Sequence, residues 1–450
     1  MKPQMRSIAL LLAACCTQLG DQQSAVKLEQ RLDRVVQSYT DAKTFMGTAL
    51  VVRDGQVLLN KGYGFANLEW LIPNAPETKF RLGSVTKQFT AASILLLEER
   101  GKLKLDVPVK TYLPDAPAAW DKVTIFHLLT HTSGIPSFTG FPDYEPTVTL
   151  PAAPEKLVAR FRDKPLEFQP GEKWNYSNSG YVLLGYLVEK IGGQSYESFV
   201  RQNIFVPLGM RDSGYDSSSA IIAHRASGYE PGSYGPTNAG YIDMSIPHGA
   251  GALYSTTGDL LLWEQGLFGG KLLKPESLAK MTTPFKHDYA FGLGVLTEKG
   301  RKLIEHGGGI QGFNTQLTYY PDEKLTIVVL GNLTGGQPGA IAGKLAAVVH
   351  GEEVTLPGER KEVAIPAKIL ETYAGTYELA PEFKIVMTVE DGKLMTQATG
   401  QPKVQLFAAS ETRFFLKVVE AEVEFFRDAQ GVVTHLVLYQ GGRKTKGVRK

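Results

Sequence analysis

The chain has 450 residues, of which 43% are hydrophobic and 21% charged, so neither a disordered chain nor a fibrous repeat is expected. Its formal net charge is only +2, and Lys2 and Arg6, both in a short leader, account for it. The balanced charge of the remainder argues against an electrostatic nucleic-acid binder. Cys15 and Cys16 are the only cysteines, so the body of the protein is expected to hold no disulfide, no cysteine-bound metal and no catalytic thiol.

Residues 1–15 have the features of an export signal. A positive segment precedes an apolar stretch over residues 7–14, far shorter than the ~20 residues that a membrane-spanning helix needs. Leu12-Ala13-Ala14-Cys15 resembles the bacterial lipobox, in which the cysteine is acylated. We therefore expect lipidation of Cys15 and an extracytoplasmic location, either periplasmic or anchored to the membrane as a lipoprotein. A plain cleaved signal and an uncleaved cytoplasmic N-terminus are the alternatives.

The next part of the chain, residues 25–350, is predicted to form one α+β domain. The apolar pattern predicts helices over residues 26–40, 84–100 and 340–349, and strands over residues 48–52, 56–60, 291–296, 302–305, 314–320 and 325–330. Strands thus lie at both ends of the domain, with helices between them. One mainly antiparallel sheet, closed by distant parts of the chain and covered by terminal helices, is therefore expected.

A linker with Gly, Glu and two prolines is predicted at 351–366, followed by a second domain at 367–450. Short alternating segments at 384–390, 393–397, 413–418, 422–426 and 432–439 predict a small antiparallel β-sheet or barrel there. The sequence leaves open whether this domain caps a site or pairs chains, and it leaves the oligomeric state open.

The pattern Ser-x-x-Lys occurs at Ser24, Ser84 and Ser277, so context must select among the copies. Only Ser84 opens a helix that is apolar nearly all round, as expected at the centre of a domain. Residues three apart share a helical face, so the Ser84 hydroxyl and the Lys87 amine can meet. The alternative is a helix-capping serine beside a surface lysine.

Two further patterns occur once each: Tyr176-Ser177-Asn178 and His306-Gly307-Gly308. In this order, the three patterns resemble the motif set of the serine β-lactamase and penicillin-binding-protein superfamily. Surrounding phrases, at residues 80–87, 128–134 and 249–256, resemble its branch of class C β-lactamases and D-alanyl-D-alanine carboxypeptidases. The resemblance implies an antiparallel sheet beside an all-α region, and the tail resembles the small, lipocalin-like β-domain often appended to such hydrolases.

The resemblance also implies roles for the motif residues. Ser84 would be the nucleophile, Lys87 the amine that receives its proton, and Tyr176 the relay to the leaving group and the deacylating water. An ordinary lysine is neutral in about one molecule in 2,500 at pH 7, a penalty near 4.6 kcal/mol, so Lys87 needs a lowered pKa. The backbone N–H groups of Ser84 and Gly309 would form the oxyanion hole.

His306, Gly307 and Gly308 would contact the substrate, a small molecule or a short peptide, and Asn178 would hydrogen-bond either Lys87 or the substrate amide. No cofactor or metal is expected. Where related β-lactamases and carboxypeptidases usually carry lysine, this chain has His306, which is mostly neutral at pH 7. This favours an ester, an amide or a D-amino-acid peptide as substrate. A class C-type β-lactamase, a D-Ala-D-Ala carboxypeptidase and a non-catalytic sensor of cell-wall peptides are the alternatives.

His127 and His131 are four apart on a predicted helix, a spacing also found in metal sites. No glutamate follows His127, as it does in zinc proteases, so structural roles are expected for both.

Overall fold

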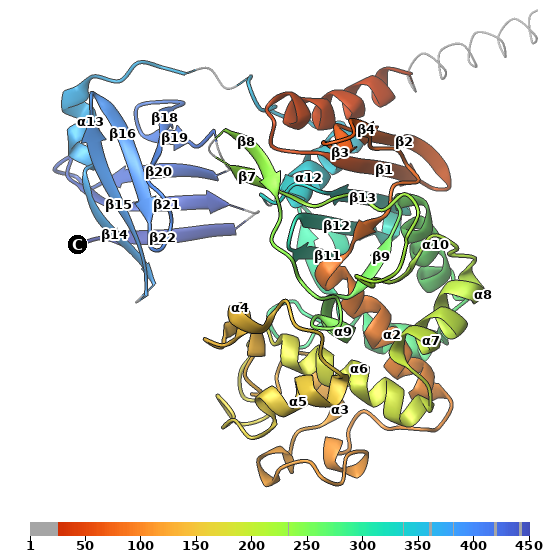
Figure 1. The fold of residues 1–450 in the computed structure, drawn as a ribbon. Coiled ribbons are helices and arrows are strands. Elements are labelled where there is room, and N and C mark those ends of the chain that lie inside the picture. The colour runs from red at the N-terminus through yellow and green to blue at the C-terminus, as the bar shows by residue number, and fades with distance from the viewer. Residues whose placement is uncertain are drawn as a thin grey trace, which may run out of the picture. The chain divides into compact units, whose positions relative to one another are not determined.

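The computed structural model describes residues 26–232, 234–335, 337–359, 362–380, 382–417, 421–440 and 443–450 (Figure 1). The leader with Cys15, and with it the predicted lipidation site, lies outside the described residues. The described residues divide into two compact units. The first contains residues 26–33 and those of Met46–Thr334, and the second contains Arg34–Phe45 and those of Gly335–Lys450. The domain boundaries given above, at 350 and 367, stay predictions.

The first unit contains a six-stranded, wholly antiparallel sheet. Its strands, in spatial order, are β10 (Gly294–Glu298), β11 (Arg301–Ile310), β12 (Phe313–Tyr320), β13 (Leu325–Gly331), β1 (Gly47–Arg53) and β2 (Gln56–Tyr63). Pairing of β1 with β13 joins segments far apart in the chain, as predicted (Figure 1). The turn between β1 and β2 uses Asp54 and Gly55, both with positive φ, as type I′ hairpins require.

Two strands differ from the prediction in their bounds. The predicted strand at 291–296 is replaced by β10, which begins three residues later, and the predicted strand at 302–305 continues as β11 to Ile310. Three consecutive glycines, with their low β-propensity, conceal this extension in the sequence. The pairing of β11 with β12, for example Gly308 with Thr315, keeps the glycines in the ladder.

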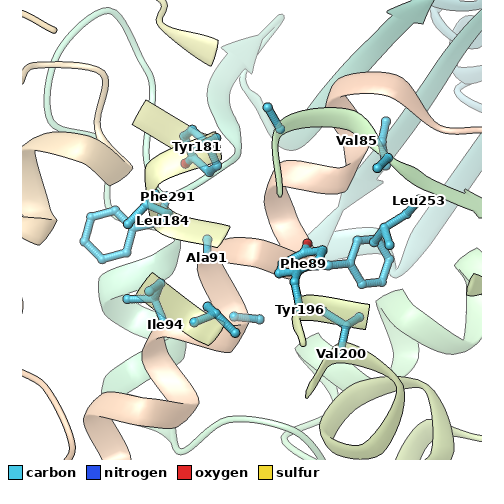
Figure 2. Close-up of a cluster of buried hydrophobic side chains, with 14 of the residues drawn as sticks. Val85, Phe89, Ala91, Ile94, Tyr181, Leu184, Tyr196, Val200, Leu253 and Phe291 are labelled. Carbon is cyan, nitrogen blue, oxygen red and sulfur yellow. The ribbon is translucent and has the colours of Figure 1, made fainter. Parts of the chain in front are cut away.

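Helices between β2 and β10 form the all-α region of the first unit. They are α2 (Thr86–Glu99), α3 (Ile125–Leu129), α4 (Tyr144–Thr147), α5 (Pro154–Arg162), α6 (Asn178–Gly192), α7 (Tyr196–Val200), α8 (Val206–Leu208), α9 (His248–Gly251), α10 (Thr257–Phe268) and α11 (Pro275–Met281). Every residue of α2 from Thr86 to Leu97 is buried, which confirms the predicted central helix. Figure 2 shows Phe89 and Ile94 of α2 in an apolar cluster with side chains from α6 and α7.

Short strands complete the first unit. They are β3 (Phe65–Asn67) with β4 (Ile72–Pro73), β5 (Phe80–Arg81) with β9 (Leu253–Ser255) and β6 (Gly214–Tyr215), and β7 (Tyr229–Gly232) with β8 (Gly235–Asn238). The strand β5 leads directly to Ser84, and α10 packs against β1 and β13.

The second unit contains part of the helix over residues 26–41, α12 (Gln337–Val349), α13 (Ala367–Tyr373) and a nine-stranded antiparallel sheet. The strands, in spatial order, are β17 (Val404–Gln405), β16 (Lys393–Ala398), β15 (Phe383–Glu390), β14 (Gly375–Ala380), β22 (Arg443–Arg449), β21 (Val433–Gln440), β20 (Ala421–Arg427), β19 (Arg413–Phe415) and β18 (Phe407–Ala408). Only Leu406 separates the two edge strands along the chain, so the sheet forms a nearly closed barrel. This confirms the predicted β-domain.

Among the described residues, no helix combines the length and the apolar character that crossing a membrane requires.

Candidate functional site

Ser84 lies in a 3₁₀ turn, Gly83–Val85, that leads into α2. Gly83 has a φ of +54°, a left-handed conformation that favours glycine. The Ser84 side chain is not the cap of α2, because the residue at the cap position is Val85 and it makes no side-chain capping bond. The Oγ atom of Ser84 lies 3.0 Å from Nζ of Lys87, one helical turn further on. The predicted meeting of hydroxyl and amine is therefore present.

Lys87 is buried, and its amine has three oxygen neighbours. Nζ lies 3.0 Å from Ser84 Oγ, 3.0 Å from Asn178 Oδ1 and 2.9 Å from the carbonyl oxygen of Ala250 in α9. An ammonium group has three N–H donors, so it satisfies all three contacts. A neutral amine still donates to Asn178 and Ala250, since these oxygens only accept, and its lone pair then faces the Ser84 hydroxyl.

Burial lowers the pKa of Lys87 well below its ordinary value, because the charged form loses its hydration. This is the direction that a general base needs, since it raises the population of neutral amine at neutral pH. The same helix fixes both groups: Ser84 precedes α2 and Lys87 lies in its first turn, so their spacing depends on local helical geometry.

The ring of Tyr176 lies close to the Lys87 amine. Nζ of Lys87 is 4.8 Å from the centroid of the Tyr176 ring. Burial raises the pKa of Tyr176 above its ordinary value, while interaction with the nearby Ser84 hydroxyl opposes this rise. The phenol is therefore protonated at neutral pH. It can donate its proton to an oxygen or nitrogen of a molecule bound next to the Ser84 side chain. The structure thus brings Ser84, Lys87 and Tyr176 together.

Asn178 is the first residue of α6, whose N-terminus is capped by the Ser177 hydroxyl, which accepts from Gly180 N at 3.3 Å. The Asn178 side-chain oxygen faces Lys87, and its amide nitrogen donates to Thr139 Oγ1 at 3.2 Å. The backbone N–H of Asn178 donates to Ser137 Oγ at 3.1 Å. The Thr139 hydroxyl therefore fixes the orientation of the side-chain amide, and the Ser137 hydroxyl holds the backbone of Asn178. No sequence pattern indicates either hydroxyl, because this segment has no periodicity.

The glycines of the third motif let β11 approach the turn that holds Ser84. A Cβ atom on Gly308 would lie 1.9 Å from the carbonyl oxygen of Leu82, and one on Gly83 would lie 2.8 Å from Gly309 N. The strand β10 ends its pairing at Glu305, so β11 beyond this point has β12 on one side and the turn on the other. Gly309 is exposed beside Ser84 and Gly307 is exposed further along the strand.

His306 lies in β11 with defined partners for both ring nitrogens. Nδ1 is 2.6 Å from the carbonyl oxygen of Gly307, which can only accept, so Nδ1 carries the proton. Nε2 then accepts from the Tyr289 hydroxyl at 2.9 Å. Burial, helped by the charge of Lys87, lowers the pKa of His306 to about 4. The imidazole is therefore neutral at neutral pH, unlike the lysine found at this motif position in related hydrolases.

His131 lies among the aromatic rings of the site, a position that the sequence did not indicate. Its ring centroid is 4.3 Å from that of Tyr176 and 4.7 Å from that of Tyr289. It is not on α3 with His127, because α3 ends at Leu129 and His131 has a φ of +56°. The prediction that His127 and His131 lie on one helix is therefore wrong. His127 forms a capping box with Thr124, a structural role as predicted.

The cleft above Ser84 has a volume of about 90 Å³. Its lining comes from the 3₁₀ turn Gly83–Val85, from α4, α6 and α9, from the end of β11 and from the segments before α4 and α9. It includes Ser84, Thr139, Tyr144, Asn178, Ile242, Ala250, Gly309 and Gln311. Among the described residues, none that lines this cleft carries a formal charge. Within the residues that the structure describes, no group of three or more His, Cys, Asp or Glu side chains is placed to hold a metal ion.

The Ser277 copy of the first motif has a different environment. Lys280 is half exposed and binds Glu98, with Nζ 2.9 Å from Oε1. Ser277 itself is buried in α11. This copy therefore lacks both the cleft and a buried amine. Ser24 lies outside the described residues.

The sequence matches known families over most of its length. Residues 32–351 match the β-lactamase family, and residues 359–448 match a domain of unknown function, DUF3471. Penicillin-binding protein 4* of Bacillus subtilis (strain 168) is 32% identical to this chain over 451 residues, which cover 93% of this chain and 98% of that protein.

Solved structures show the same similarity. The octameric penicillin-binding protein homologue from Pyrococcus abyssi superposes with a TM-score of 0.65 at 28% identity, covering 93% of this chain and 99% of that one. A D-stereospecific amidohydrolase from Streptomyces sp. superposes with a TM-score of 0.59 at 26% identity, covering 72% of this chain and 97% of that one.

Proposed function

Because the chain belongs to the β-lactamase family of serine hydrolases, we propose that it cleaves an ester or amide bond through an acyl-enzyme on Ser84. One observation carries the proposal: the Ser84 hydroxyl lies 3.0 Å from a buried amine whose pKa is lowered. A hydroxyl is a weak nucleophile at neutral pH unless an adjacent base removes its proton, and neutral Lys87 is such a base.

In the acylation step, Lys87 Nζ takes the proton of the Ser84 hydroxyl as Oγ attacks the carbonyl carbon of the substrate. The carbonyl oxygen becomes an oxyanion, which the backbone N–H groups of Ser84 and Gly309 stabilise. The bond to the leaving group then breaks, and Tyr176 donates its phenolic proton to the departing oxygen or nitrogen. The proton on Lys87 passes to Tyr176, which restores the phenol and the neutral amine.

Deacylation repeats these transfers with water. Water gives a proton to the Tyr176–Lys87 pair as its oxygen attacks the acyl carbon, and Ser84 Oγ leaves and recovers a proton from Lys87. Asn178 contributes by fixing the amine, since its side-chain oxygen accepts from Nζ at 3.0 Å. The protonated state of Tyr176 at neutral pH supports its role as donor to the leaving group.

The neutral His306 favours substrates without a carboxylate next to the scissile bond. The similarity to a D-stereospecific amidohydrolase supports amides and peptides of D-amino acids among them. A class C-type β-lactamase or D-Ala-D-Ala carboxypeptidase would need another cation near position 306 for the substrate carboxylate.

The test is covalent labelling combined with turnover. Wild-type protein should react with a fluorophosphonate probe and hydrolyse p-nitrophenyl esters and D-amino-acid p-nitroanilides, and Ser84→Ala should lose both by about 10³-fold or more. Ser277→Ala is the matched control, since it carries the same spacing outside the cleft. No covalent adduct on the wild type, together with no turnover of these esters, would favour a non-catalytic sensor of cell-wall peptides.

Export is a second part of the proposal and rests on the leader sequence alone. We infer that Cys15 is acylated and that the protein acts outside the cytoplasm. Metabolic labelling with a radioactive fatty acid tests this inference: Cys15→Ser should abolish the label and Cys16→Ser should retain it. A label that persists in Cys15→Ser, or an unlabelled wild-type protein in the cytoplasmic fraction, would contradict it.

A further inference from the structure

A second hollow, of about 520 Å³, adjoins the cleft that holds Ser84. Gln311 lines both cavities, and the neighbouring residues Ile242 and Tyr241 line the cleft and the hollow respectively. Arg81, only three residues before Ser84, lines the hollow. A substrate bound at Ser84 that extends past Gln311 therefore enters this hollow, whose volume is in the usual range for small-molecule sites.

The charge of the hollow differs from that of the cleft. Two arginines, Arg81 and Arg225, line it, and no acidic residue does within the part of the chain that the structure describes. Both guanidinium groups bind Asp216, whose side chain is fully buried: Arg81 Nε lies 2.6 Å from Oδ2 and an Arg225 amino nitrogen 2.6 Å from Oδ1. The three side chains together carry a net charge of +1. The nearby Lys79 pairs with Asp212 and leaves this balance unchanged.

This arrangement holds surplus hydrogen-bond donors in fixed positions. Two guanidinium groups carry ten N–H donors, whereas a carboxylate offers about four acceptor positions. Asp216 orients both arginines, and the Phe313 ring, 5.7 Å from the Arg81 guanidinium carbon, lies against one of them. Arginines held in this way are preorganised to bind a second carboxylate with paired hydrogen bonds.

Apart from the two arginines, most of the side chains that line the hollow are apolar. They include Ile222, Phe313 and two exposed side chains at the rim, Ile221 and Tyr241. The ligand chemistry that fits is therefore an apolar chain that ends in a negative charge. An apolar chain alone would leave the surplus donors unused, and a cation would be repelled.

We propose that this hollow is a substrate subsite that binds a carboxylate at the end of an apolar arm, distant from the scissile bond. The proposal rests on the proposed hydrolase function and adds the substrate class. It places the cation for a substrate carboxylate at Arg81 and Arg225, whereas position 306 is neutral. The carboxylate can belong to the acyl part of the substrate or to its leaving group, and the hollow recognises the same chemistry in both.

Matched substrates that differ only in charge test the proposal. For the acyl arm, p-nitrophenyl monoesters of dicarboxylic acids from succinate to suberate are compared with their methyl-capped forms. For the leaving-group arm, O-acetylated ω-hydroxy acids with a free carboxylate are compared with the same O-acetylated acids whose carboxylate is capped as a methyl ester. The charged member should have a kcat/KM about tenfold higher than its capped partner in one arm, with an optimum chain length and a loss of preference at high salt.

Variants then locate the charge that is responsible. Arg225→Gln should lower the charged-to-capped ratio about tenfold, chiefly through KM, and Arg100→Gln, a matched control outside the hollow, should keep it. Because Arg225→Gln disturbs the Asp216 pair, the fully exposed Ile221 provides an independent check. Ile221→Glu should lower the ratio, and Ile221→Lys should raise it.

A binding measurement separates this proposal from the proposed function. Calorimetric titration of Ser84→Ala with suberate and with dimethyl suberate should show tighter binding of the dianion, weakened in Ser84→Ala/Ile221→Glu. If the capped esters are hydrolysed and the charged-to-capped ratio of kcat/KM is near one in both arms, the subsite is overturned and the proposed hydrolase function is retained. Absence of all hydrolysis, with suberate still preferred in titration, would overturn the hydrolase and retain the anion site. Equal binding of both compounds would overturn the subsite.

Discussion

The imidazole of His131 packs against the phenol ring of Tyr176, with ring centroids 4.3 Å apart. It also accepts a hydrogen bond from Ser177, the residue that follows Tyr176. Its Nδ1 accepts from the backbone N–H of Ser177 at 3.1 Å, so in the neutral ring Nε2 carries the hydrogen. Burial lowers the pKa of His131 well below its ordinary value and keeps the ring neutral. His131 is therefore a positioning residue for the segment that carries Tyr176 and Asn178.

We predict that His131→Phe lowers kcat by about 10- to 100-fold and changes KM by less than about threefold. The phenyl ring keeps the packing but leaves the Ser177 N–H without an acceptor, a cost of about 1–3 kcal/mol that displaces Tyr176. Asn tolerates the positive φ at this position and offers an acceptor, so His131→Asn should restore part of kcat. His127→Phe is the control and should lower thermal stability only. An unchanged kcat in His131→Phe would refute the positioning role.

The lowered pKa of Lys87 predicts a characteristic pH dependence of activity. Neutral amine is the reactive form, so kcat/KM should rise with pH and reach its plateau well below pH 10.5. A pH–rate profile measured with a neutral ester gives the pH at which this rising limb of the activity occurs. Lys87→Met should lower kcat by about 10³-fold or more and remove the limb. A wild-type limb at the ordinary lysine pKa would contradict the assignment of Lys87 as base.

The same shift predicts how stability changes with pH. Between the lowered folded-state pKa of Lys87 and about 10.4, the unfolded chain binds more protons than the folded one. The free energy of unfolding should therefore rise with pH in this window, by at most about 1.4 kcal/mol per pH unit from this group. Urea denaturation of wild type and Lys87→Met across this range isolates the effect. Parallel curves for the two proteins would show that the amine keeps an ordinary pKa.

The sequence was sufficient for those parts of the site that depend on local geometry. Ser84 and Lys87 are one helical turn apart, and the long apolar run after them identifies a central helix, so their meeting needs no tertiary information. The six-stranded sheet was also predictable, because β1, β12 and β13 have strong apolar patterns bounded by turn signals.

Other parts of the site depend on tertiary contacts and leave no pattern. The Ala250 contact to Lys87 uses a backbone carbonyl, which any residue could supply. Thr139 lies in a 3₁₀ turn, Phe138–Gly140, and Ser137 precedes it. Their hydroxyls reach Asn178 only because α6 packs next to that turn. The extension of β11 was missed because its glycines are selected by the close approach to Leu82, a constraint that overrides β-propensity.

Gly308 allows that approach, and its substitution should be costly. In Gly308→Ala the new Cβ would lie 1.9 Å from the Leu82 carbonyl oxygen, so β11 must move away from the turn that holds Ser84. We expect kcat/KM to fall by about 100-fold, because one oxyanion-hole donor alone is worth about 2.7–4 kcal/mol. Gly307→Ala is the matched comparison. Its Cβ would meet the end of the Gln316 side chain at 3.1 Å rather than a backbone atom at 1.9 Å, so its loss of kcat/KM should be much smaller. Equal losses would show that this close approach is not required.

The neutral imidazole of His306 predicts a gain of function on substitution by lysine. With a pKa of about 4, His306 carries no charge at pH 7, whereas His306→Lys would place an ammonium group beside the cleft. Acylation by a penicillin, whose carboxylate lies near the reacting carbonyl, should become faster by about tenfold or more. The new positive charge should also lower the pKa of Lys87 further and move the activity limb to lower pH. His306→Gln, which adds no charge, is the control. Equal acylation rates for the lysine and glutamine variants would show that charge at position 306 does not govern carboxylate recognition.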